Sequence, residues 1–183
     1  EEPIAAAIGA GLPISEATGS MVIDIGGGTT EIAVMSLGGV VYSNSLRVAG
    51  DAMDGALANY MRKEYNLMIG DSTAEKIKKE IGTAIATNNN TYAVKGRDLR
   101  SGTPKEVNIT EEDTVEALNP ILKEMINGIK DALENTPPEL SADLVDMGLT
   151  LTGGGALLKN IDKRLSKETG LPVHIACLLY TSD

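Results

Sequence analysis

The feature that most constrains this fold is a pair of glycine runs, each of which follows a short apolar segment. The first run lies in residues 24–30 (DIGGGTT), and the second lies in residues 151–155 (LTGGG). Successive glycines let the backbone turn tightly and direct several N–H groups at one anion, such as a phosphate. Each run alone also fits a plain connection between neighbouring elements. Together, in a chain of 183 residues, two such runs favour a phosphate-binding site over two unrelated turns.

Composition excludes several classes of protein. The 16 Lys and Arg against 26 Asp and Glu give a net charge of −10, which argues against nucleic-acid binding. With no Trp, no Phe and five Tyr, the chain has no aromatic platform for bases. A single cysteine, Cys177, cannot form an internal disulfide, and a single histidine, His174, excludes a histidine-rich metal site. We expect His174 to be a structural residue, buried in a strand.

Apolar periodicity and turn residues predict the order of the elements. Strands are expected at residues 20–25, 31–36, 40–48, 148–152 and 172–176, with a hairpin at 92–109. Helices are expected at residues 3–9, from Asp51, from Ser72, from Thr110 to the prolines at 137–138, and at 156–169. Asp51 is the expected cap of its helix, and Ser72 with Glu75 is expected to form a capping box.

Three segments, in order, resemble the motifs of a known superfamily. Residues 2–9 (EPIAAAIG), 24–31 (DIGGGTTE) and 151–155 (LTGGG) are similar to the connect-1, phosphate-2 and adenosine motifs of the actin superfamily. That superfamily joins actins, heat-shock chaperone ATPases and sugar kinases. Within it the chain most resembles the MreB family, bacterial actins that determine rod shape. The similarity runs from Glu1 to about Ile175 and covers only the second half of such a protein, so we expect this chain to be a piece of a longer one.

The resemblance implies a fold and a division into domains. The expected fold is an actin-like ATPase domain, an α/β fold with a ribonuclease-H-like core and an inserted smaller α/β subdomain. The core would comprise residues 1–50 and 110–176, and the insertion would comprise residues 51–109. Residues 177–183 (CLLYTSD) depart from the family pattern, so we assign no function to them or to Cys177.

The resemblance also implies roles for the residues of the first two motifs. Glu2 matches the acid that positions the attacking water, and Thr30 is a second candidate for that catalytic role. Asp24 matches the aspartate that organises Mg²⁺, a cation that prefers carboxylate oxygen. The residues that would cradle the phosphates of ATP are Gly26, Gly27, Gly28 and Thr29.

The remaining candidate residues lie on the nucleoside side of the expected site. The residues that match the helix facing the ribose and adenine are Glu75, Lys78, Lys79 and Gly82. The residues that would close the site from the opposite side are Gly153, Gly154 and Gly155. An ordinary exposed ion-pair face is the alternative interpretation of Glu75, Lys78 and Lys79.

As a function, the resemblance implies an ATP-hydrolysing filament protein that uses ATP and Mg²⁺. The expected partners are other copies of the protein, the cell-wall elongation machinery and the inner membrane surface, with no nucleic acid. The expected location is the cytoplasm, at the inner face of the cell membrane. A chaperone-type ATPase domain of the same superfamily is the alternative. We expect this half alone to be inactive, because an actin-type site clamps the phosphates from both sides.

Overall fold

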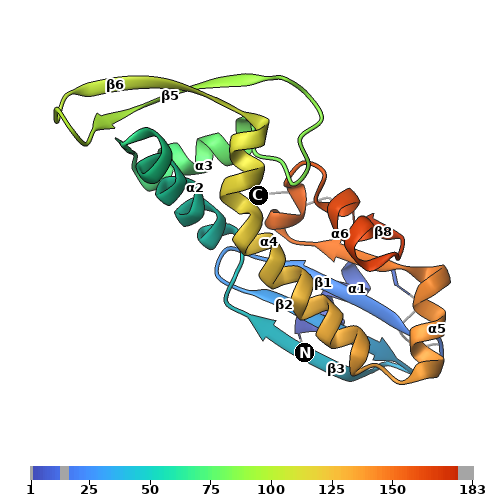
Figure 1. Cartoon of the computed structure of the whole chain (residues 1–183). Coiled ribbons are helices and arrows are strands. Elements are labelled where there is room, and N and C mark those ends of the chain that lie inside the picture. The colour runs from blue at the N-terminus through green and yellow to red at the C-terminus, as the bar shows by residue number, and fades with distance from the viewer. Residues whose placement is uncertain (1, 13–16, 177–183) are drawn as a thin grey trace.

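The computed structural model describes residues 2–12 and 17–176, and within them it contains two β-sheets joined by helices (Figure 1). Glu1, Cys177 and the rest of the 177–183 tail lie outside the described residues. The larger sheet is mixed, and its strand order is β3-β2-β1-β7-β8. Its strands are β1 (Ser20–Ile25), β2 (Thr30–Ser36), β3 (Gly39–Leu46), β7 (Leu149–Thr152) and β8 (Val173–Ile175).

Pairing within this sheet combines antiparallel and parallel neighbours. β1 runs antiparallel to β2 and parallel to β7, with Asp24 opposite Thr152. The strands that precede the two glycine runs are therefore neighbours in one sheet. β3 forms one edge, and its register with β2 shifts at a bulge between Val34 and Met35.

The two faces of the larger sheet are covered by different helices (Figure 1). Successive side chains of a strand point to opposite faces. Met21 and Ile23 of β1 therefore join the large core that includes α4 (Glu111–Glu134), whereas Val22 packs with Ala7 of α1 (Glu2–Gly9) in a smaller cluster. The sheet is thus buried on both faces.

The smaller sheet is formed by residues between positions 67 and 110, in the order β4-β5-β6. Its strands are β4 (Leu67–Met68), β5 (Thr91–Asp98) and β6 (Pro104–Thr110), so the hairpin predicted at 92–109 is confirmed. Two helices accompany this sheet, namely α2 (Gly50–Tyr65) and α3 (Asp71–Glu80). Buried side chains of both helices belong to the same hydrophobic cluster as α4, so one continuous core connects the two sheets.

Several predicted boundaries are wrong for identifiable reasons. Asp51 does not cap α2, because the first N–H groups of that helix donate to carbonyls of residues 26 and 27, and Ala49 is the N-cap. Glu75 forms no capping box, because it pairs with Lys79 and the N-cap of α3 is Gly70. His174 lies in β8 as predicted, but it is exposed.

The second half of the chain also differs from the predicted elements. The predicted helix at 156–169 is two elements, the 3₁₀ helix η1 (Gly154–Leu157) and the helix α6 (Ile161–Thr169). Asn160, in left-handed conformation, separates them. An additional helix, α5 (Pro138–Met147), was not predicted, although a proline at its first position is a common start signal.

A polar network fixes the start of α4 against the end of α2. The carboxylate of Asp113 accepts hydrogen bonds from the hydroxyls of Tyr60 (2.6 Å) and Tyr65 (2.8 Å) and from the N–H of Thr110 (2.8 Å). Burial raises the pKa of Asp113, but these hydrogen bonds outweigh it and the net pKa is lowered. Burial, followed by the bond to Asp113, raises the pKa of Tyr65 to about 12.

This network should make the stability of the fold depend on pH at both extremes. Because the Asp113 pKa is lower in the folded state, its contribution is present above about pH 4 and is lost as the pH falls through the folded pKa. Because the Tyr65 pKa is raised, its contribution is present below about pH 10 and is lost as the pH rises toward about 12.

Urea unfolding of the wild type and of Asp113→Asn tests the acid limb. At neutral pH the variant should be about 1–2 kcal/mol less stable, because its hydrogen bonds lose the charged acceptor. Toward pH 3 the variant should lose less stability than the wild type. Parallel losses in both proteins would contradict the assignment.

Candidate functional site

The parallel pairing of β1 and β7 places the two glycine loops side by side. Both strands end at the same edge of the sheet, where the loop after each one begins. The second loop packs directly on the end of β1. A Cβ on Gly153 would overlap the Ile25 carbonyl oxygen, and a Cβ on Gly155 would overlap the Ile25 side chain. Gly153 also has a φ of 87°, so glycine is required there for both reasons.

The first loop is fixed to the start of α2 by its own backbone. The carbonyl of Gly26 accepts from the N–H of Gly50 (3.0 Å), and the carbonyl of Gly27 accepts from the N–H of Asp51 (2.8 Å). The N–H of Gly26 is used within the turn, where it donates to the Thr29 carbonyl (3.0 Å). Residues 27–29 are exposed, so this segment is the part of the loop that can contact a ligand.

A pocket of about 490 Å³ opens where these parts meet. It lies among the first loop, the first turn of α2, the face of α3 and the second loop. The residues that line it are Gly26, Gly27, Gly50, Asp51, Met53, Asp54, Glu75, Lys78, Lys79, Gly82, Gly154, Gly155, Leu157, Leu158 and Lys159. The lining contains three acidic side chains (Asp51, Asp54 and Glu75) and three basic ones (Lys78, Lys79 and Lys159).

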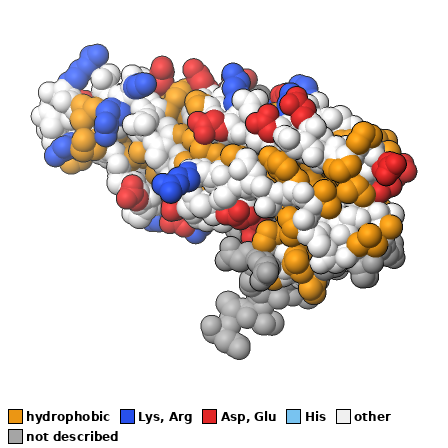
Figure 2. All heavy atoms as spheres, turned by 90° about the horizontal axis from the view of Figure 1, so that it is seen from below, with side chains coloured by type: hydrophobic (Ala, Val, Ile, Leu, Met, Phe, Trp, Pro, Cys, Tyr) orange, Lys and Arg blue, Asp and Glu red, His pale blue; other side chains and the backbone are white. Residues whose placement is uncertain are grey.

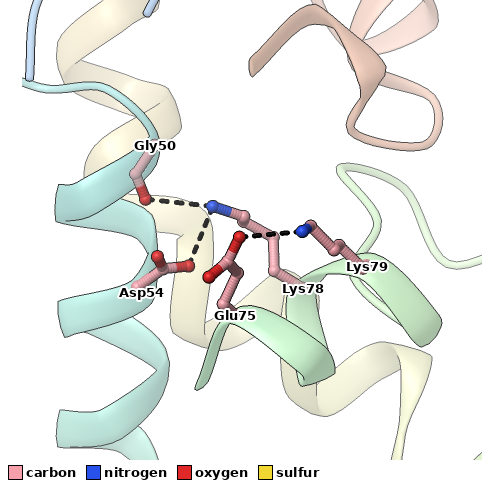
Figure 3. A network of polar contacts seen from close by, with 5 residues as sticks. All are labelled: Gly50, Asp54, Glu75, Lys78 and Lys79. Atoms are coloured by element: carbon pink, nitrogen blue, oxygen red, sulfur yellow. Dashed lines mark hydrogen bonds and ion pairs between the residues drawn. The ribbon is translucent and has the colours of Figure 1, made fainter. Parts of the chain in front are cut away.

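One wall of the pocket is a polar network between α2 and α3 (Figure 3). The Nζ atom of Lys78 contacts Asp54 Oδ1 at 2.9 Å and donates to the Gly50 carbonyl at 3.3 Å. Only 20% of the Lys78 side chain and 17% of the Asp54 side chain are exposed. This partly buried pair therefore holds α3 against α2 and orients the lysine at the pocket.

The second pair of the wall is more exposed. Lys79 Nζ lies 2.8 Å from Glu75 Oε1, one helical turn away. The hydrogen bond from Lys79, with its positive charge, lowers the pKa of Glu75, and the reciprocal bond raises the pKa of Lys79. Both side chains thus remain charged at neutral pH, and their exposure leaves them accessible to a ligand.

The pocket brings together most of the candidate residues named from the sequence. Those that line it are Gly26, Gly27, Glu75, Lys78, Lys79, Gly82, Gly154 and Gly155. Gly153 precedes the lining residue Gly154, and a Cβ on Gly153 would overlap the Asp24 carboxylate, so both residues lie beside the pocket. Gly28 and Thr29 are exposed on the first loop but are outside the lining. The side chain of Glu2 lies outside the described residues.

The structure does not bring Thr30 into the pocket. Thr30 is fully buried, and its hydroxyl donates to the Val48 carbonyl at 2.6 Å. That bond ties the start of β2 to the segment that leads into α2. In this structure the Thr30 hydroxyl is used in that bond, and the residue supports the position of the first loop.

Sequence reasoning missed several residues of the lining. Asp51 and Asp54 both face the pocket, and their spacing of three on a helix was a usable signal that they share a face. Leu157 is 82% exposed at the edge of the pocket, and Lys159 follows on the same wall. No local signal marks these last two residues, because the 3₁₀ turn that presents them was predicted as a regular helix.

Comparison with known proteins identifies the family. A family model described as MreB/Mbl protein matches residues 1–179. The chain belongs to the MreB/Mbl family. It is 53% identical over 177 residues to the cell shape-determining protein MreB of Escherichia coli (strain K12), across 96% of this chain and 51% of that protein. The chain thus spans about half the length of the curated MreB and Mbl relatives that it matches.

Solved structures confirm the predicted actin-like fold. MreB 5 of Spiroplasma citri, bound to AMPPNP, has a TM-score of 0.93 and 44% identity, and the match covers 96% of this chain and 53% of that one. The MamK double helical filament has a TM-score of 0.76 at 21% identity, across 96% of this chain and 53% of that one, and shows a shared fold.

Within residues 2–12 and 17–176, none of the helices combines the length and the apolar character of a membrane-spanning segment.

The glycine geometry of this MreB/Mbl chain yields a test with a neighbouring control. Gly153→Ala should lower the free energy of unfolding by about 2–4 kcal/mol, because the new methyl overlaps Ile25 and the backbone is left-handed. Gly154→Ala should change it by less than about 0.5 kcal/mol, since open space surrounds that position. Urea unfolding measures both, and equal effects would refute the close packing of the second loop on β1.

Proposed function

We propose that this chain is the second half of a bacterial actin that binds ATP with Mg²⁺ and hydrolyses it as the protein assembles into filaments. The observation that carries the proposal is the pocket that both glycine loops form with α3 at the carboxyl ends of β1 and β7. Crevices at this edge of an α/β sheet are the usual place for nucleotides. The match to MreB 5 bound to AMPPNP and to ADP supports the same ligand class.

The pocket divides naturally between the two parts of a nucleotide. The exposed residues 27–29 would hold the phosphates through backbone N–H groups and the Thr29 hydroxyl. Lys78, Lys79 and Glu75 on one wall, with residues 154–159 opposite, would hold the ribose and base. Leu157 offers the apolar surface that a flat base requires.

Asp24 fits a site for Mg²⁺ that is completed by the nucleotide. Among the described residues no group of three or more acidic, histidine or cysteine side chains gathers to hold a metal by itself. Mg²⁺ commonly takes one or two carboxylates and fills its remaining positions with phosphate oxygens and water. The Asp24 carboxylate, beside the second loop at the end of β1, suits that arrangement. Bound there, the ion would neutralise phosphate charge.

Glu2 is the proposed residue for orienting the attacking water. It opens α1, whose sequence resembles the connect-1 motif. Phosphoryl transfer depends more on an oriented nucleophile and on charge stabilisation than on a strong base. A carboxylate at this position would accept a hydrogen bond from water and direct its lone pair at the phosphate.

The cellular output that we propose is a filament, located at the inner face of the cell membrane, that directs the cell-wall machinery and so maintains rod shape. The name of the E. coli relative supports the cell-shape role.

Seen from below, hydrophobic side chains gather toward the end of the molecule that carries α5 (Figure 2). Leu37 in the β2–β3 turn and Val145 of α5 are 72% and 62% exposed, which suits contact with another copy.

Residues 1–50 with 110–176 are proposed as one subdomain and residues 51–109 as another, with the pocket at their junction. Each sheet would then belong to one subdomain, since the smaller sheet lies almost entirely within residues 51–109.

The family match favours the filament over a chaperone-type ATPase. Sedimentation of the full-length protein with ATP tests the assembly directly, and a protein that stays in the supernatant would exclude the filament.

The chain alone should bind ATP poorly and should not hydrolyse it above background. It supplies one side of the site, whereas transition-state stabilisation requires donors around the whole transferring phosphate and exclusion of water. Isothermal titration with Mg-ATP and a phosphate-release assay measure the two properties. Micromolar affinity with turnover from these 183 residues would show that this half is self-sufficient.

In the full-length protein, Glu2→Ala should slow hydrolysis by about 10²-fold or more and leave ATP binding nearly unchanged. The reason is that an oriented water matters in the transition state and not in the bound ground state. Glu1→Ala, one residue away with the same loss of charge, is the matched control and should retain turnover. Unchanged hydrolysis in Glu2→Ala under polymerising conditions would reassign Glu2 to capping α1.

A further inference from the structure

Asn160 links the two walls of the pocket from a position just behind its lining. It adopts a left-handed conformation, with φ 62°, between η1 and α6. Its side-chain Nδ2 donates to Thr83 Oγ1 at 3.0 Å and to the Ile85 carbonyl at 3.1 Å. Residues 83–85 follow α3, so the Asn160 amide contacts the α3 wall from the end of the wall formed by residues 154–159.

The surroundings of this amide form a well-connected link between the walls. The N–H of Ala84 donates to the Lys159 carbonyl at 2.8 Å, and Thr83 and Lys159 form a parallel β-bridge. Thr83 is fully buried, and its hydroxyl donates to the Ile85 carbonyl at 2.7 Å while it accepts from Asn160. A buried hydroxyl with both functions in use has a fixed orientation.

The sequence neighbours of this link line the pocket. Gly82 precedes Thr83, and Leu158 and Lys159 precede Asn160. On the other side of α3, the Lys78–Asp54 pair fixes that helix against α2. The Asn160–Thr83 contact, together with the backbone bond from Ala84 to Lys159, therefore sets how far the second loop and its 3₁₀ turn lie from the lysines of α3.

We propose that Asn160 is a positioning residue, which sets the width of the nucleotide pocket through its hydrogen bond to Thr83. The inference rests on the proposed function and deepens it, because it concerns the walls that would hold the ribose and base. Loosening the link separates these walls and leaves the phosphate loop at residues 26–29 in place. Affinities for ADP and for a non-hydrolysable ATP analogue should therefore fall by the same factor.

The test compares two asparagines in the same backbone conformation. Asn160→Gly retains the left-handed φ and removes only the side-chain amide. Asn66→Gly is the matched control, since Asn66 has φ 50° at the C-cap of α2 and lies outside the pocket lining. In the full-length protein, Asn160→Gly should weaken binding of fluorescent ADP and of AMPPNP by about tenfold each, as the loss of two hydrogen bonds implies. Asn66→Gly should leave both dissociation constants within twofold.

A second pair of variants separates positioning from loss of folding. Thr83→Ser keeps the hydroxyl and should bind nucleotide like the wild type. Thr83→Val keeps the shape, loses the acceptor for Asn160 and should match the defect of Asn160→Gly. Urea unfolding of each variant shows whether the protein is folded under the binding conditions.

The outcomes distinguish this inference from the function on which it rests. If the wild-type protein binds no nucleotide, the proposed function fails and this inference fails with it. If the wild type binds and Asn160→Gly binds equally well, only this inference is overturned. It is also overturned if Asn66→Gly is as defective as Asn160→Gly, or if ADP and AMPPNP lose affinity by different factors.

Discussion

The parallel pairing of β1 with β7 is the interaction on which the rest of the site depends. These strands are separated by more than 120 residues, and their alignment brings the ends at Asp24 and Thr152 to one edge of the sheet. The pocket forms at this edge, because both glycine loops begin there. The second loop lies against Ile25 because glycines permit it, and the first loop anchors α2 through backbone bonds. The backbone pairing of β1 with β7 thus places two glycine turns, distant in the sequence, in the wall of one pocket.

Features that depend on local chemistry could be predicted from the sequence. Apolar patterning and turn residues predict both glycine loops, the strands before them and the hairpin of β5 and β6. The structure contains each of these features. The start of α4 at Thr110 was also predicted, and in the structure Thr110 and Asp113 form a capping box there. At these positions the local preference and the tertiary structure agree.

The features that the sequence did not reveal depend on partners far away in the chain. The sequence does not show that the Thr30 hydroxyl donates to the Val48 carbonyl and is buried by that contact. Asp51 was predicted as an N-cap, but carbonyls of the first glycine loop accept the hydrogen bonds from the first N–H groups of α2. The break at Asn160 depends on contacts with residues 83–85, and helix patterning continues through it. The errors at Asp51 and Asn160 both arose where tertiary hydrogen bonds replaced the local ones that the sequence favoured.

The bulge between Val34 and Met35 has a consequence for how copies of this protein can meet. β3 and β6 are edge strands, and exposed edges pair readily with edges of other molecules. The bulge disturbs the regular ladder next to β3, while Pro104, Lys105 and Glu106 interrupt the free edge of β6 with a missing donor and with charges. Pairing of further strands is thereby discouraged at these two edges, one in each sheet. In the filament proposed above, this protection would leave side-chain contacts as the route to assembly.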